Sequence, residues 1–126
     1  MTEPLRRMLA LDGITCLLMG LVLVLAADEL SKLFALPVNL LVYAGILLFP
    51  CAALMLAIAG RPWPPSTLVW MVIAGNALWV LASLVVALVL FEPSALGLSF
   101  LLLQAAVVAV LLVYELRGLK ARVSVR

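Results

Sequence analysis

The chain has 126 residues, of which 68% are apolar and 11% are charged, and its formal net charge is +2. A soluble domain has about 45–50% apolar and about 25% charged residues, so this composition excludes an ordinary water-exposed fold. It predicts one domain of membrane helices, with the lipid bilayer as its first partner. The small net charge argues against a nucleic-acid partner, and the absence of histidine removes the commonest metal and haem ligand, so no metal and no cofactor is expected.

The first apolar run covers residues 8–27 and follows Arg6 and Arg7. Its length predicts a membrane-spanning helix. Asp12 interrupts the run, which favours a span over a cleavable secretory signal. A carboxylate about one turn inside a membrane has to be protonated, paired or hydrated, so Asp12 is a candidate functional residue.

A short amphipathic helix is predicted next, at residues 28–34. Leu30, Leu33 and Phe34 fall on one face of this helix, and its charged residues fall largely elsewhere. Such a pattern is typical of a helix that lies along a membrane surface, here the outer one. Pro37 ends the segment.

Three more spans follow, at residues 38–59, 67–91 and 95–116. Pro50 lies near the middle of the first of these and predicts a kink, because proline cannot donate to the carbonyl four residues earlier. The Pro-rich segment 60–66 and the segment 91–97 separate the spans. We expect the basic tail after residue 116 to be frayed or bound to the membrane surface. The predicted fold is therefore an all-α, four-helix, up-down transmembrane bundle.

Charge asymmetry predicts the orientation of this bundle. The two ends of the chain and the segment 60–66 hold all but one of the eight Lys and Arg residues: Arg6, Arg7, Arg61, Arg117, Lys120, Arg122 and Arg126. The two other connections hold only Lys32. By the positive-inside rule, both termini and the middle loop are expected to be cytoplasmic.

Polar side chains within the spans are the candidate functional residues. Asn76 and Gln104 lie at about the same depth on the third and fourth spans. Lipid offers neither amide a partner, so the simplest prediction is a mutual hydrogen bond between them. Trp79 lies one turn after Asn76 and is expected in the core or on the wall of a pocket.

Glu115 lies near the cytoplasmic end of the fourth span, at a depth similar to that of Asp12. Two interpretations stay open. Asp12, Asn76, Gln104 and Glu115 could face one cytoplasm-facing cleft; alternatively, the carboxylates form salt bridges with Arg7 and Arg117 that anchor the helix ends. Cys16 and Cys51 lie in apolar runs with no CxxC spacing, which predicts free thiols that pack as small hydrophobic groups.

A weak internal repeat is a further hypothesis. A shift of 64 residues places Asp12 on Asn76 and Asp28 on Glu92, and the first and third spans run in the same direction. The two halves of the chain would then be parallel copies of one helical hairpin.

Three segments carry a resemblance: GNALWV (75–80), LGLSFLLLQ (96–104) and YELRGLK (114–120). Together they resemble a group of small, uncharacterised bacterial four-helix inner-membrane proteins, known mostly as hypothetical proteins. The resemblance implies the four-helix layout and an inner-membrane location, and it brings no activity with it.

Two functions are compatible with these features. The first is a non-enzymatic interaction or assembly subunit, with a homo-oligomer or another membrane protein as its partner. The second is a small oligomeric transporter or lipophilic-ligand-binding bundle that uses the polar cleft. The chain holds no nucleophile–base, metal or phosphate motif, so an enzyme is the least expected function.

Overall fold

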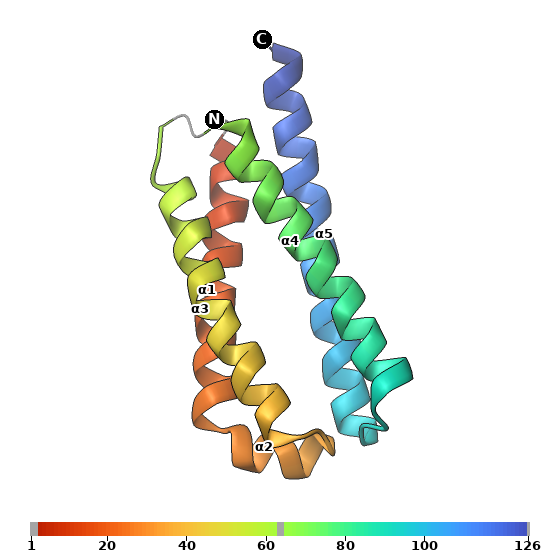
Figure 1. The fold of residues 1–126 in the computed structure, drawn as a ribbon. Coiled ribbons are helices and arrows are strands. Elements are labelled where there is room, and N and C mark those ends of the chain that lie inside the picture. Colours follow the sequence, from red (N-terminus) through yellow and green to blue (C-terminus); the bar gives the residue numbers. More distant parts are fainter. Residues whose placement is uncertain (1–2, 63–64, 126) are drawn as a thin grey trace.

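A computed structural model describes the backbone of residues 3–62 and 65–125 (Figure 1). The burial of side chains is described for residues 5–62 and 65–120. The described chain is built of helices: α1 (Glu3–Leu25), α2 (Ala27–Phe34), α3 (Val38–Ala59), α4 (Ser66–Val85), a π-helical turn η1 (Val86–Leu90) and α5 (Ala95–Val125). Four of them, with η1 extending α4, are long and apolar enough to cross a membrane. The predicted all-helical fold with four candidate spans is confirmed.

The element boundaries agree with the predicted spans, with three differences. Helix α1 runs from Glu3 to Leu25, whereas the predicted span covers residues 8–27. The third span ends in the π-helical turn η1 rather than as a regular α-helix. Helix α5 does not end near residue 116 but continues to Val125, so the tail is helical and not frayed, while its binding to the membrane surface stays a prediction. Leu119 is 1% exposed and packs in the same core cluster as Leu5 of α1, so α5 contacts the bundle beyond residue 116.

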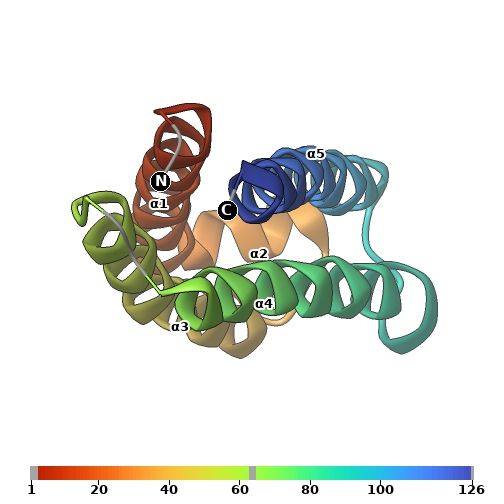
Figure 2. The same cartoon turned by 90° about the horizontal axis from the view of Figure 1, so that it is seen from above.

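The long helices are arranged as two pairs. Helix α1 packs chiefly on α3, and α4 packs chiefly on α5 (Figure 2). Gly20 and Gly45 explain the first pair, because a Cβ atom on Gly45 would lie 2.9 Å from the carbonyl oxygen of Gly20. Small residues at this crossing allow the two backbones to touch, which is the usual basis of close helix packing in membranes.

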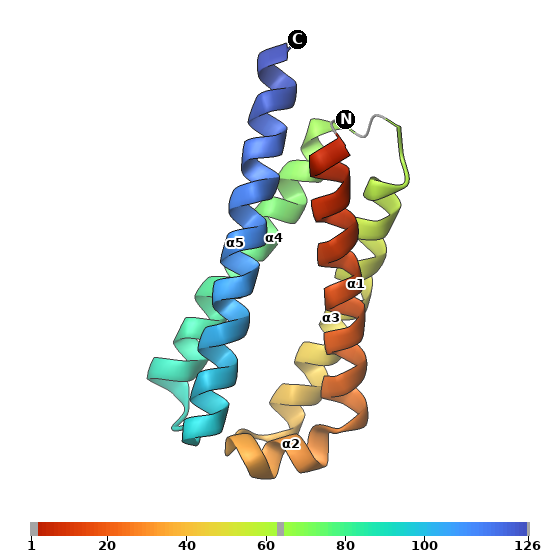
Figure 3. The same cartoon turned by 180° about the vertical axis from the view of Figure 1, so that it is seen from behind.

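The two pairs meet at both ends of the molecule and are separated between them (Figures 1 and 3). At the end where the N-terminus lies, an apolar cluster that includes Leu9, Ile58 and Val69 joins α1, α3, α4 and α5. At the opposite end, α2 crosses between the pairs, and its Phe34 is 6% exposed. The site described below lies between these two cores.

Ser94 fastens α2 to the start of α5. Its backbone N–H donates to the carbonyl of Phe34 at 2.9 Å, and its hydroxyl donates to the carbonyl of Leu33 at 2.6 Å. The same hydroxyl accepts a hydrogen bond from the N–H of Gly97 at 3.1 Å and so caps α5. The rings of Phe34 and Phe100 stack with centroids 4.7 Å apart. This contact links the two helix pairs at the α2 end.

Candidate functional site

Three polar side chains from separate helices meet in the interior. The side-chain amide of Asn76 on α4 donates to Oδ2 of Asp12 on α1 at 2.7 Å and to Oε1 of Glu115 on α5 at 2.8 Å. Asp12 is 1% exposed, Asn76 5% and Glu115 0%. One amide therefore bridges two buried carboxyl groups, and it uses both of its N–H donors to do so. We call these three residues the carboxyl–amide cluster.

The carboxyl–amide cluster has more acceptors than donors. Oδ1 of Asp12 accepts only a long contact from the thiol of Cys16, at 3.7 Å. Oε2 of Glu115 is buried and has no hydrogen-bond partner among the described residues. A hydrogen-bond donor from outside the chain, such as a cationic group, would supply what the cluster lacks.

A second polar network joins α4 to α5 about two turns away. The indole N–H of Trp79 donates to Oε1 of Gln104 at 2.8 Å. The amide of Gln104 donates to the hydroxyl of Ser83 at 2.8 Å and to the carbonyl of Leu101 at 2.9 Å. The hydroxyl of Ser83 donates in turn to the carbonyl of Trp79. Each polar group of this network has a partner, so packing accounts for it fully.

The structure thus divides the five candidate residues into two groups. The predicted hydrogen bond between Asn76 and Gln104 is wrong, because each amide has other partners. Gln104 lies eleven residues before Glu115 on α5, about 16 Å along the axis, so it meets α4 at a different level. Asp12 accepts a hydrogen bond from Asn76 and a long contact from Cys16, and Glu115 does not line the cavity described below. The cytoplasm-facing cleft and the anchoring salt bridges both stay predictions.

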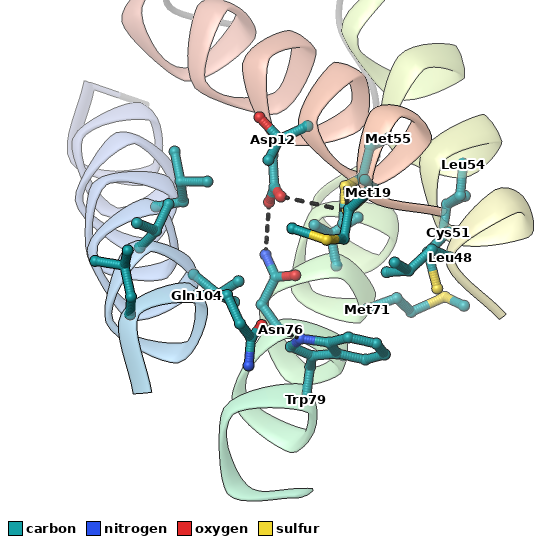
Figure 4. Close-up of a pocket in the computed structure, with 18 of the residues that line it drawn as sticks. Asp12, Met19, Leu48, Cys51, Leu54, Met55, Met71, Asn76, Trp79 and Gln104 are labelled. Atoms are coloured by element: carbon teal, nitrogen blue, oxygen red, sulfur yellow. Dashed lines mark hydrogen bonds between the residues drawn. The ribbon is translucent and has the colours of Figure 1, made fainter. Parts of the chain in front are cut away.

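A cavity of about 320 Å³ lies between the helix pairs and is lined by α1, α3, α4 and α5 (Figure 4). Asp12, Asn76, Trp79 and Gln104 lie on its wall, which is otherwise mainly apolar. Five sulfur side chains also line it: Cys16, Met19, Cys51, Met55 and Met71. The two cysteines are free, as predicted. No periodicity in the sequence marks this sulfur-rich wall, since Met and Cys also pack as ordinary core residues.

A smaller cavity of about 140 Å³ adjoins the first and lies toward α2. The two cavities share Met19, Trp79, Phe100 and Gln104 on their walls. Leu36 and Leu41 line the smaller one near the end where α2 crosses. The space between the pairs therefore extends from the carboxyl–amide cluster past the Trp79–Gln104 network.

No model of a known protein family matches the chain, and neither a curated protein nor a solved structure matches it. Among the residues that the structure describes, no group of three or more His, Cys, Asp or Glu side chains is placed to hold a metal ion. The cavity and the carboxyl–amide cluster are therefore the features of the molecule that bear on its function.

Proposed function

We propose that this chain is a multi-pass protein of the bacterial inner membrane that binds a lipophilic ligand between its two helix pairs, as a small transporter or carrier. The observation that supports this proposal is the cavity of about 320 Å³ with buried polar groups on a mainly apolar wall. Ligand sites have this size and this combination of apolar walls with a few converging polar groups.

The cluster favours ligand binding over a purely structural role. The Trp79–Gln104 network satisfies all its polar groups, as packing between helices requires. The carboxyl–amide cluster instead leaves Oε2 of Glu115 without a partner and borders a cavity through Asp12. Buried polar groups that serve packing alone are normally hydrogen-bonded, so an unsatisfied oxygen in a cluster that reaches the cavity through Asp12 supports a functional site.

A second candidate is the interaction or assembly subunit. It is supported by the short connections between the helices, because the segments 35–37, 60–65 and 91–94 leave no room for a soluble domain between them. In that case a partner protein, including a second copy of this chain, would contact the lipid-facing surface.

The orientation is part of the proposal. We place both termini in the cytoplasm and α2 along the outer membrane surface, supported by the distribution of Lys and Arg along the chain. The carboxyl–amide cluster then lies toward the cytoplasmic end of the cavity. Reporters that are active only in the cytoplasm, fused to each terminus in turn, should both be active. One silent terminus would show that the orientation is wrong.

A cavity-filling substitution tests ligand binding. Gly75 lines the cavity, and a Cβ atom there meets nothing within 4 Å, so Gly75→Phe should fill the space without disturbing the helices. We expect the purified protein in mild detergent to bind the neutral fluorescent hydrocarbon pyrene, and Gly75→Phe to weaken this binding about tenfold or more. Ala74→Phe is the matched control, because Ala74 is exposed and does not line the cavity.

Native mass spectrometry of the same preparations separates the two candidates. A small molecule that co-purifies with the wild type and is lost in Gly75→Phe would support ligand binding. Equal pyrene binding by both phenylalanine variants would contradict it. A stoichiometric protein partner with no pyrene binding would favour the subunit.

A further inference from the structure

We propose that the cavity selects ligands that carry a protonated amine, and that this group binds the carboxyl–amide cluster through Asp12. This inference rests on the proposed function and names the chemical class of its ligand. Three features of the site lead to it: the shortage of hydrogen-bond donors, the sign of the charge on the cavity wall, and the aromatic side chains beside it.

The shortage of donors comes first. Two carboxyl groups present four oxygen atoms, whereas the cluster supplies only the two N–H groups of Asn76 and the weak thiol donor of Cys16. Oε2 of Glu115 is left without a partner although this side chain is 0% exposed. Glu115 does not line the cavity, so a ligand meets the cluster at Asp12, where N–H donors would add to the single long contact that Oδ1 accepts from Cys16.

The charge of the wall points the same way. Asp12 is the one residue with an acidic or basic side chain among the described residues that line the cavity. Because a carboxyl group lies on the wall and no basic side chain lies beside it, a ligand with one positive charge complements the wall. In a membrane interior an uncompensated charge is strongly unfavourable, so this match should dominate the selectivity.

The remaining wall suits the body of such a ligand. Trp79 and Phe100 line the cavity, and Gln104 holds the indole N–H at 2.8 Å and so fixes the ring. Aromatic faces attract cations and also pack against flat or cage-like hydrocarbon groups. We therefore infer a ligand with an ammonium head and a compact lipophilic body.

Three probes that share an adamantane body separate charge from donor capacity. They are 1-(aminomethyl)adamantane, which is cationic and has N–H donors; N,N,N-trimethyl-1-adamantylammonium, which is cationic without donors; and 1-(hydroxymethyl)adamantane, which is neutral. Their affinities can be measured by displacement of pyrene from the purified full chain at neutral pH. We expect the amine to bind about tenfold or more tightly than the alcohol, and the quaternary ion to bind between them.

Variants then assign the selectivity to the cluster. Asp12→Asn should remove the preference for the amine and keep the binding of the alcohol. Asp28→Asn, which removes an exposed carboxylate on α2, is the matched control and should keep the preference. Glu115→Gln is a second variant that lowers the acceptor surplus, and we expect it to weaken amine binding about fivefold. Size-exclusion chromatography confirms that each variant is folded.

The outcomes are distinct from those of the pyrene experiment. If the wild type binds the alcohol as tightly as the amine, the inference is wrong and the proposed function stands. If the preference for the amine survives in both Asp12→Asn and Glu115→Gln, the cluster does not carry it, and the inference is also wrong. If neither pyrene nor any adamantane probe binds, both the inference and the proposed function fail.

Discussion

The bridge that Asn76 forms between two carboxyl groups makes a quantitative prediction about stability. In Asn76→Leu the apolar volume is kept, but both hydrogen bonds, at 2.7 and 2.8 Å, are lost. Hydrogen bonds between membrane helices contribute about 0.6 kcal/mol each on average and at most about 1.7, so the loss should lower the free energy of unfolding by about 1–3 kcal/mol. The two carboxyl groups would also lose their N–H donors, which places the expected value toward the upper end.

Unfolding by titration with sodium dodecyl sulfate in mixed micelles, followed by tryptophan fluorescence, measures this difference. Asn39→Leu is the matched control, since Asn39 is exposed at the start of α3, and it should change stability by less than about 0.5 kcal/mol. An Asn76→Leu variant as stable as Asn39→Leu would refute the reasoning, because the bridge would then contribute nothing to holding α1, α4 and α5 together.

Two further substitutions test contacts outside the cluster by the same assay. Gly97→Ala should lower the free energy of unfolding by about 1–3 kcal/mol, because the new Cβ atom would overlap the carbonyl oxygen of Phe34. Gly75→Ala is the control: a Cβ atom at Gly75 meets nothing within 4 Å, so the free energy of unfolding should change by less than about 0.5 kcal/mol. Trp79→Phe keeps an aromatic ring but loses the hydrogen bond to Gln104, so its free energy of unfolding should fall by about 0.6–1.7 kcal/mol. An unchanged free energy of unfolding would show that this hydrogen bond does not hold α4 to α5.

The helical layout could be predicted from the sequence because lipid leaves a chain few choices. A backbone without water must satisfy its own hydrogen bonds, so a long apolar run becomes a helix, and Pro-rich or polar breaks mark its ends. The predicted span at residues 38–59 has the bounds of α3, and α5 begins at Ala95 as predicted. The π-helical turn η1 has no such marker, because Val86–Leu90 are ordinary helix-compatible residues.

The pairing of the polar groups could not be predicted in the same way. The sequence gives the position of a residue along its own helix, but neither the rotation of that helix about its axis nor its shift relative to its neighbours. In the structure Gln104 meets α4 at the level of Trp79 and Ser83, and Asn76 bonds instead to Asp12 and Glu115. The shift of 64 residues aligned Asp12 with Asn76 as equivalent positions, and the structure shows these two side chains in direct contact.

A last prediction distinguishes a functional cluster from a structural one. If Asp12 and Glu115 serve packing alone, Asp12→Asn and Glu115→Gln should each lower the stability of the ligand-free protein. If they form a ligand site, each change adds an amide donor next to unsatisfied acceptors, and the free energy of unfolding should rise by about 1 kcal/mol.

The gains should not add in the double variant, since the first amide already satisfies the acceptors that the second would meet. Sodium dodecyl sulfate titration of the three variants at neutral pH decides between these outcomes, and a loss of stability in both single variants would support the structural interpretation. If the cluster is a binding site, the variants should gain stability and lose the preference for the amine. The unsatisfied groups that bind the ligand destabilise the ligand-free protein, so a change that stabilises it weakens binding.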